Sequence, residues 1–176
     1  MTLVVRRARP SDAEAIARVH VETWQTTYAG LIPDGYLVRM GREQRTGFWT
    51  QALARMHHGS HVLVAEAPRV GVVGFASYGP ARASGLPAGE SYAGEIYTLY
   101  VLPDYQGRGL GRALLQQAFA GFAARGRDSA LVWVLAGNPA RFFYERLGGK
   151  RAAERIESFA GADLVELAYG WRELPR

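Results

Sequence analysis

Apolar and polar residues recur with two periods along the chain, and these periods predict a succession of strands and helices. Short runs rich in β-branched and aromatic residues predict strands, whereas apolar residues three or four positions apart predict helices. Strands are expected at residues 3–8, 61–67, 70–77, 95–102, 130–136, 150–159 and 162–171. Helices are expected after Ser11, over residues 35–56 in an interrupted or irregular form, over 109–125 and over 139–148.

Local signals set several of these boundaries. Ser11 and Glu14 have the spacing of a capping box, and the apolar residues that follow fall near one face of a helix. Residues 79–94 are rich in Gly, Ala, Pro and Ser, so we expect a mobile loop there instead of a domain boundary. Gly148 and Gly149 are expected to end the last helix.

Composition indicates one globular domain that spans residues 1–176, since the chain is 48% hydrophobic and needs no linker. The absence of cysteine excludes disulfides and thiolate metal sites. The first residues lack the order of a signal peptide, and no uncharged run approaches the roughly 20 residues that span a bilayer. We therefore expect a soluble, cytoplasmic protein without a membrane partner.

The net charge of +5 comes almost entirely from arginine, Lys150 being the only lysine. Such a charge is typical either of an anionic ligand or nucleic acid as a partner, or of an arginine-rich surface in contact with solvent. No long basic run occurs, which favours the surface and predicts no nucleic-acid partner. An arginine-rich nucleic-acid binder stays as a competing hypothesis.

Three glycines, Gly107, Gly109 and Gly111, separate a predicted strand from a predicted helix. The first N–H groups of a helix have no partner within it, and the helix dipole places partial positive charge at the same end. Glycine lets a ligand approach this backbone closely. The order strand, glycine turn and helix therefore favours a phosphate site, and a glycine turn without a ligand is the alternative.

Two common phosphate motifs do not match. A dinucleotide fingerprint requires glycine or alanine where Arg112 stands, and a P-loop requires Ser or Thr where Arg151 follows Gly149 and Lys150.

Two motifs together carry a family resemblance. The sequence Gln-Gly-Arg-Gly-Leu-Gly at residues 106–111 resembles the (Arg/Gln)-x-x-Gly-x-(Gly/Ala) segment of the GCN5-related N-acetyltransferase (GNAT) family. Asn138, followed six residues later by Tyr144, is similar to the second signature of that family. The resemblance covers nearly the whole chain in order. It implies an α/β fold with a mixed, largely antiparallel sheet of about seven strands, flanked by about four helices.

The resemblance implies a site for acetyl-coenzyme A (acetyl-CoA). The diphosphate would lie on the backbone N–H groups of residues 108–112, and the pantetheine arm would add to the strand at residues 99–101, where two strands splay apart. Asn138 would contact the coenzyme arm, although an Asn-Pro pair that merely starts a turn is the alternative. The expected contacts are Leu99, Tyr100, Val101, Gln106, Gly107, Arg108, Gly109, Leu110, Gly111, Arg112, Asn138, Phe143 and Tyr144.

The implied reaction moves the acetyl group directly to a primary amine of a small molecule or peptide in a ternary complex. The Leu99 N–H would polarise the thioester carbonyl, and Tyr144 would act as general acid toward the thiolate, at a cost of about 2 kcal/mol from reference pKa values. Glu95 is expected on the same face of its strand as Leu99, where it could take the amine proton through water. Each of these residues also has a structural alternative: sheet pairing for Leu99, core packing for Tyr144 and an exposed strand end for Glu95.

Trp24 and Tyr28 lie four residues apart and are similar to the first helical pair of many GNAT members. They could line the acceptor pocket or simply pack in the core. The histidines have no recognised metal spacing, so no metal is expected. A coenzyme-binding module without catalytic activity is the alternative function. The sequence does not identify the acceptor amine, and either a monomer or a homodimer is compatible with it.

Overall fold

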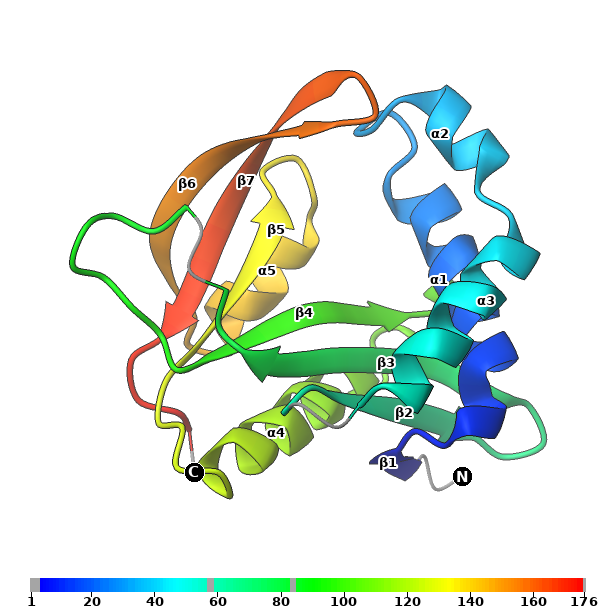
Figure 1. Cartoon of the computed structure of the whole chain (residues 1–176), viewed down its shortest axis with the longest axis horizontal. Helices are drawn as coiled ribbons and strands as arrows, with labels where there is room; N and C mark the ends of the chain where they lie inside the picture. Colours follow the sequence, from blue (N-terminus) through cyan, green and yellow to red (C-terminus); the bar gives the residue numbers. More distant parts are fainter. Residues whose placement is uncertain (1–3, 57–58, 83–84, 176) are drawn as a thin grey trace.

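A computed structural model describes residues 4–56, 59–82 and 85–175, which form a single sheet flanked by helices (Figure 1). Its strands are β1 Val4–Arg7, β2 His61–Ala67, β3 Gly71–Pro80, β4 Gly94–Val101, β5 Ala130–Leu135, β6 Lys150–Phe159 and β7 Ala162–Trp171. Its α-helices are α1 Ala13–Thr27, α2 Asp34–Arg39, α3 Arg42–Ala54, α4 Leu110–Ala123 and α5 Ala140–Arg146. Two short 3-10 helices, Pro10–Asp12 and Pro103–Tyr105, precede α1 and α4.

The seven strands pair in the order β1-β2-β3-β4-β5-β7-β6. All neighbours are antiparallel except β4 and β5, which run parallel. A parallel pair needs a crossover connection, and the segment that contains α4 supplies it. The sheet therefore is mixed and largely antiparallel, as predicted.

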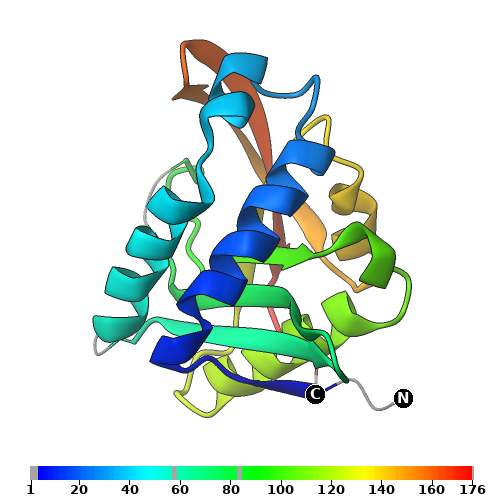
Figure 2. The same cartoon turned by 90° about the vertical axis from the view of Figure 1, so that its right-hand side faces the viewer.

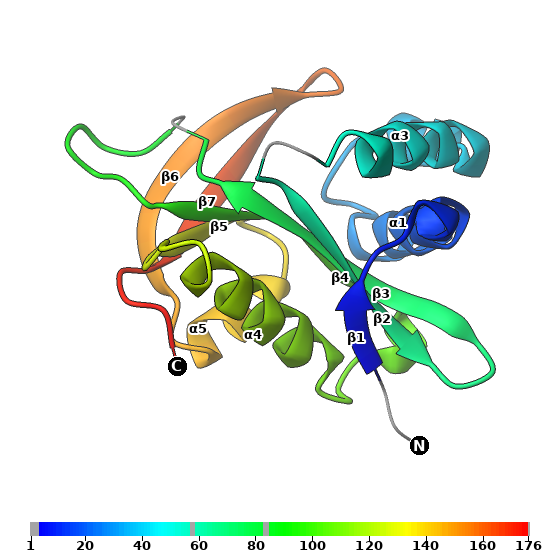
Figure 3. The same cartoon turned by 60° about the horizontal axis from the view of Figure 1, so that its bottom comes forward.

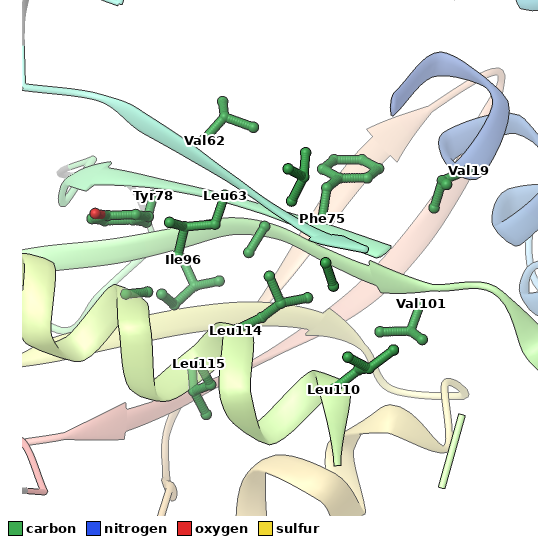
Figure 4. Packing of buried hydrophobic residues seen from close by; sticks show 14 of the residues in the cluster. Val19, Val62, Leu63, Phe75, Tyr78, Ile96, Val101, Leu110, Leu114 and Leu115 are labelled. Carbon is green, nitrogen blue, oxygen red and sulfur yellow. The ribbon is translucent and has the colours of Figure 1, made fainter. Parts of the chain in front are cut away.

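Helices cover both faces of the sheet. Figure 3 shows α1 and α3 on one face and α4 on the other, and Figure 2 shows α1 and α3 running side by side. In the core, Val19 and Phe75 lie on one side of the sheet, whereas Leu110, Leu114 and Leu115 of α4 lie on the other (Figure 4). Removing one such leucine side chain from water contributes about 1.5–3 kcal/mol, so this packing holds α4 and its N-terminus in place.

Most expected elements are present with boundaries shifted by one to three residues. The interrupted helix expected at 35–56 is two helices, α2 and α3. The described residues contain five α-helices where about four were expected, because the interruption divides that segment. The loop expected from residue 79 begins after Pro80, because β3 continues pairing with β4 as far as Gly94. Residues 83–84 of that loop, and residue 3 of the first expected strand, lie outside the described ranges.

The expected capping box of Ser11 and Glu14 is wrong. Asp12 stands at the N-terminus of α1, and its carboxylate accepts a hydrogen bond from the Arg9 backbone N–H at 2.6 Å, across the short 3-10 helix. Arg6 of β1 donates to the same carboxylate, at 2.7 Å. This ion pair with Arg6 lowers the pKa of Asp12 and ties the start of α1 to the edge strand.

Candidate active site

Strands β4 and β5 separate in the middle of the sheet. Their parallel pairing joins Gly94 to Ala130 and ends at Ile96 and Val132. Beyond these residues β4 continues to Val101 and β5 to Leu135 without pairing to each other in the described ladder. Figure 1 shows the two strands leaving a common base in diverging directions. The splay expected from the sequence is therefore present.

The backbone of Leu99 and Val101 points into this gap. Leu102 donates its N–H to the Val73 carbonyl of β3 at 2.9 Å. Hydrogen-bonded and non-hydrogen-bonded pairs alternate along an antiparallel ladder, so Val101 and Leu99 belong to the pairs that do not bond to β3. Their N–H and C=O groups point away from β3, and the Gln106 side chain donates to the Val101 carbonyl from that side, at 3.0 Å. Leu99 thus offers a free edge to an extended ligand.

The N-terminus of α4 lies at the end of β4. Gly107 and Gly109 have φ of 71° and 83°, the left-handed region that favours glycine, and Gly109 is the N-cap. The first intrahelical bond runs from Ala113 N–H to the Gly109 carbonyl at 2.9 Å, so the N–H groups of Leu110, Gly111 and Arg112 have no acceptor within α4. A Cβ placed on Gly107 or Gly109 would meet no atom within 4 Å, so the backbone at this turn is open to a ligand. Residues 107–112 are called the cradle below.

The third glycine has a different role. A Cβ on Gly111 would lie 3.2 Å from the Phe143 ring and 3.8 Å from Leu99, so Gly111 lets α5 pack closely against the start of α4. Phe143 therefore packs at the start of α4, where the Leu99 side chain of β4 also lies. Arg108 and Arg112 are exposed beside the cradle, and Arg108 lies 5.2 Å from the centre of the Tyr105 ring.

Tyr144 is directed inward from α5. Its side chain is only 5% exposed and packs against Phe143 at 5.1 Å and against Trp171 at 6.3 Å between ring centres. Its hydroxyl forms no hydrogen bond within the described residues. Burial, and then the nearby Tyr100, raise the pKa of Tyr144 above its ordinary value. The phenol is consequently neutral at physiological pH and can donate a hydrogen bond.

A buried polar cluster joins this side of the sheet to α1. Asn138 is 5% exposed, and its side-chain oxygen accepts from the Ala140 N–H at 2.9 Å, which caps the first turn of α5. Burial is the main reason that the pKa of Tyr28 is raised to about 12. Contacts of its hydroxyl with Tyr100 and Asn138 act in the opposite direction and offset part of this rise. The Trp24 ring packs on Tyr28 at 4.9 Å. Trp24, Tyr28, Asn138 and Tyr100 therefore lie together in this cluster.

The expected placement of Glu95 is wrong in two respects. Residue pairs in the ladder pass from Ser77 and Thr98 directly to Tyr78 and Ile96, so Tyr97 is an extra residue and forms a β-bulge. The bulge therefore places Glu95 on the face of β4 that carries Tyr100. Leu99 lies on the opposite face. Glu95 is also not an exposed strand end, because it is 1% exposed.

Arg82 holds the Glu95 carboxylate. The Arg82 backbone N–H donates to Glu95 Oε2 at 2.9 Å, and its Nε and Nη2 both donate to Oε1, the Nε at 3.1 Å. The guanidinium also lies 4.7 Å from the centre of the Tyr97 ring. This pairing anchors the segment after β3 over the start of β4.

Sequence reasoning missed an aromatic and basic group beside Trp24. His20, Tyr36 and Phe159 lie 5.3, 6.1 and 6.1 Å from the Trp24 ring, measured between ring centres. The guanidinium carbon of Arg45 lies 6.0 Å from it. These residues come from α1, α2, α3 and the β6-β7 hairpin, so only the tertiary fold brings them together. The histidine and tryptophan four residues apart on α1 were the one local signal.

Comparison with known proteins agrees with this geometry. The family model described as an acetyltransferase (GNAT) domain matches residues 58–148. The uncharacterized N-acetyltransferase YuaI of Bacillus subtilis is 37% identical over 172 residues, which cover 98% of this chain and 94% of that protein. This chain belongs to the GNAT family. It is an acetyl-CoA-dependent acetyltransferase by family, and its fold and the open cradle at α4 fit that assignment.

Two solved structures have the same fold as this GNAT protein. The putative acetyltransferase yncA from Salmonella typhimurium, with its cofactor acetyl-CoA, has a TM-score of 0.71 and 25% identity, covering 100% of this chain and 96% of that one. PaiA N-acetyltransferase from Thermoplasma acidophilum, in complex with coenzyme A, has a TM-score of 0.70 and 22% identity, covering 95% and 98% of the two chains.

Among residues 4–56, 59–82 and 85–175, no helix is both long enough and apolar enough to cross a membrane. Within the same ranges, no group of three or more His, Asp or Glu side chains is arranged to hold a metal ion.

Proposed function

We propose that this GNAT protein transfers the acetyl group of acetyl-CoA to a primary amine of a small molecule or peptide, by direct attack in a ternary complex. One observation carries the proposal: the free backbone edge of β4 at Leu99 lies beside the open N-terminus of α4. Acetyl-CoA supplies an activated thioester, and the residues around it bind, orient and donate hydrogen bonds.

The two ends of the coenzyme would be held by backbone groups. The diphosphate would accept hydrogen bonds from the N–H groups of residues 108–112, each worth about 1.5–3 kcal/mol when charge-assisted. The exposed side chains of Arg108 and Arg112 add positive charge there. The pantetheine amides would pair with Leu99 and Val101 as an added strand, and Asn138 and Phe143 would line its path from α5.

Two donors would act on the thioester. The Leu99 N–H points into the gap between β4 and β5, where it would stabilise the oxyanion that forms on the carbonyl. The Tyr144 hydroxyl would donate to the departing thiolate. Because burial raises the pKa of Tyr144, complete proton transfer from it costs more than the reference values suggest, and hydrogen bonding is the cheaper role.

The acceptor amine would approach from the face of β4 that carries Tyr100 and Glu95. A carboxylate has about four acceptor sites, and Arg82 occupies three of those on Glu95. One site on Oε2 is left for a water molecule, through which Glu95 would take the amine proton. Trp24 and Tyr28 would form the wall of the acceptor pocket.

The test combines coenzyme binding with turnover. Acetyl-CoA at one hundred times its Kd should add about 2.7 kcal/mol to stability and raise the Tm by roughly 5–10 °C. A panel of primary amines should then release free thiol with one acetylated product per thiol. No Tm shift at saturation would overturn the proposal. A shift without acetylation of any amine would instead indicate a coenzyme-binding module.

A further inference from the structure

A hollow lies between α2 and α3, on the same side of the sheet as the proposed acceptor site. It has a volume of about 430 Å³ and is lined by Tyr36, Arg39, Met40, Gln44, Arg45 and Phe48. Its walls combine two aromatic rings with two guanidinium groups. The composition suits a ligand that has an apolar body and an anionic group.

Arg45 is the half-buried cation of this hollow. Its guanidinium carbon lies 6.0 Å from the Trp24 ring and 5.9 Å from the Phe48 ring, and its Nη2 donates to the Tyr36 hydroxyl at 2.9 Å. No carboxylate of the described residues forms an ion pair with it, whereas Arg42, one turn earlier on α3, is paired with Glu22. The buried Nε of Arg45 has no hydrogen-bond partner.

Two further buried N–H groups near Arg45 are also unpaired. His20 accepts the Trp49 N–H on Nδ1 at 3.1 Å, so its proton is on Nε2, and Nε2 has no partner. The Trp24 Nε1–H lies near the Tyr100 hydroxyl without meeting the geometry of a hydrogen bond. Buried donors are normally paired. His20, Trp24 and Arg45 thus carry three buried donors without partners, and of these three residues Arg45 lines the hollow.

The hollow is connected to the free edge of β4 by aromatic contacts. The Arg45 guanidinium carbon lies 6.0 Å from the centre of the Trp24 ring, and this centre lies 6.4 Å from that of Tyr100. Tyr100 is the residue next to Leu99, whose N–H points toward the proposed thioester site. Arg45 and the Tyr100 ring are therefore at most about 12 Å apart, a span that a short peptide, or an amino acid with a long chain between its amine and its carboxylate, can cover.

We propose that the acceptor is a small primary amine that also carries a carboxylate or a similar oxyanion, and that Arg45 binds this oxyanion. The inference rests on the proposed function and specifies its substrate class. A planar guanidinium binds an oxyanion through two parallel N–H groups. The Tyr36 and Phe48 rings, which line the hollow, hold the apolar part of the acceptor.

The charge of this hollow also predicts which amines are excluded. A polycationic amine would be repelled by Arg45 and Arg39.

The experiment compares amines that differ in one group. The amino acids 6-aminohexanoate and 8-aminooctanoate are each assayed beside their carboxamides, with aminoalkyl phosphonates as a second oxyanion and spermidine as a polycation. Free thiol and acetylated product are measured for wild-type protein, Arg45→Gln, Arg45→Lys and the control Arg42→Gln. Arg42 carries the same charge on the same helix, but its side chain is 54% exposed and outside the hollow.

Wild-type protein should prefer the oxyanion-bearing amines over the carboxamides by about 10- to 100-fold in kcat/KM. Arg45→Gln should remove this preference, mainly by raising KM for the oxyanion-bearing amines, whereas Arg45→Lys should restore part of it. Preference for carboxylates or for phosphonates identifies which oxyanion the pocket takes. Arg42→Gln should behave as wild type.

Three results would overturn the inference: equal use of amino acids and their carboxamides, a preference for spermidine, or an Arg45→Gln variant that keeps the oxyanion preference. An acetyl-CoA-dependent Tm shift without turnover of any amine in the panel also counts against it. Absence of that Tm shift in wild-type protein is a separate outcome, because it refutes the proposed function itself.

Discussion

His20 makes the stability of this protein depend on pH, and the effect can be worked out from its surroundings. The side chain is 5% exposed, and burial, followed by the positive charge of Arg45, lowers its pKa from 6.5 to about 3. The unfolded chain binds a proton on this histidine below pH 6.5, whereas the folded protein does not. The free energy of unfolding therefore falls as the pH drops below 6.5 and stops falling near pH 3.

The size of this loss of stability follows from the same two pKa values of His20. At pH 5.0 the unfolded histidine is 1.5 pH units below its ordinary pKa, so the loss relative to pH 7.5 is about 2 kcal/mol. The assay is urea unfolding at pH 7.5 and pH 5.0, with the linear slope checked for a constant m-value. His20→Gln keeps an acceptor for the Trp49 N–H but cannot titrate, so its stability should lose most of this pH dependence.

Two other groups define the controls. Burial also lowers the pKa of His61, so His61→Gln reports its part of the same window. Asp12, whose pKa is lowered from 3.8 by Arg6, contributes stability that is lost only below that value, outside the range tested. Equal pH slopes for wild-type protein and His20→Gln would refute the reasoning.

Three further predictions concern the site. Tyr144→Phe should lower kcat by about 100-fold and leave coenzyme affinity within about twofold; wild-type kcat would remove Tyr144 from the reaction. Gly109→Val should abolish the acetyl-CoA Tm shift, because Gly109 has φ of 83° and its Cβ would enter the open cradle, whereas Gly126→Val, with a φ of 69° and equally open space at the far end of α4, should keep the shift; a shift in both variants would exclude the cradle. Arg82→Gln should cost about 1–3 kcal/mol in urea unfolding by leaving the Glu95 carboxylate buried without its guanidinium, and adding Glu95→Gln should recover part of that loss; an unaffected single variant would show that the pair contributes nothing.

Much of the fold could be predicted because its elements are locally specified. The strand-glycine-helix order around Gly109 predicts both the turn and the anion-binding end of α4 from backbone chemistry alone. The splay between β4 and β5 followed from the family resemblance, and the pairing confirms it. The interruption between α2 and α3 was also expected.

The remaining features depend on contacts between distant segments. No glycine or proline at or beside Tyr97 marks the bulge in the sequence, yet the bulge decides which face Glu95 occupies. The burial of Glu95 depends on Arg82, 13 residues earlier in the chain. The hollow at Arg45 is lined from two helices and borders residues of a third. No short motif predicts such an arrangement, because each residue has an ordinary local role.

The free backbone edge of β4 has a consequence for the protein without its coenzyme. Unpaired strand edges are templates for self-association, and proteins usually cover them. Here the edge is enclosed, with β5 diverging on one side and the segment from Gln106 bonded to Val101 on the other. Because β4 lies in the middle of the strand order, with β3 paired on its other side, this edge is reached through the gap beside β5. The splay therefore creates a free edge inside the sheet, away from the outer strands β1 and β6.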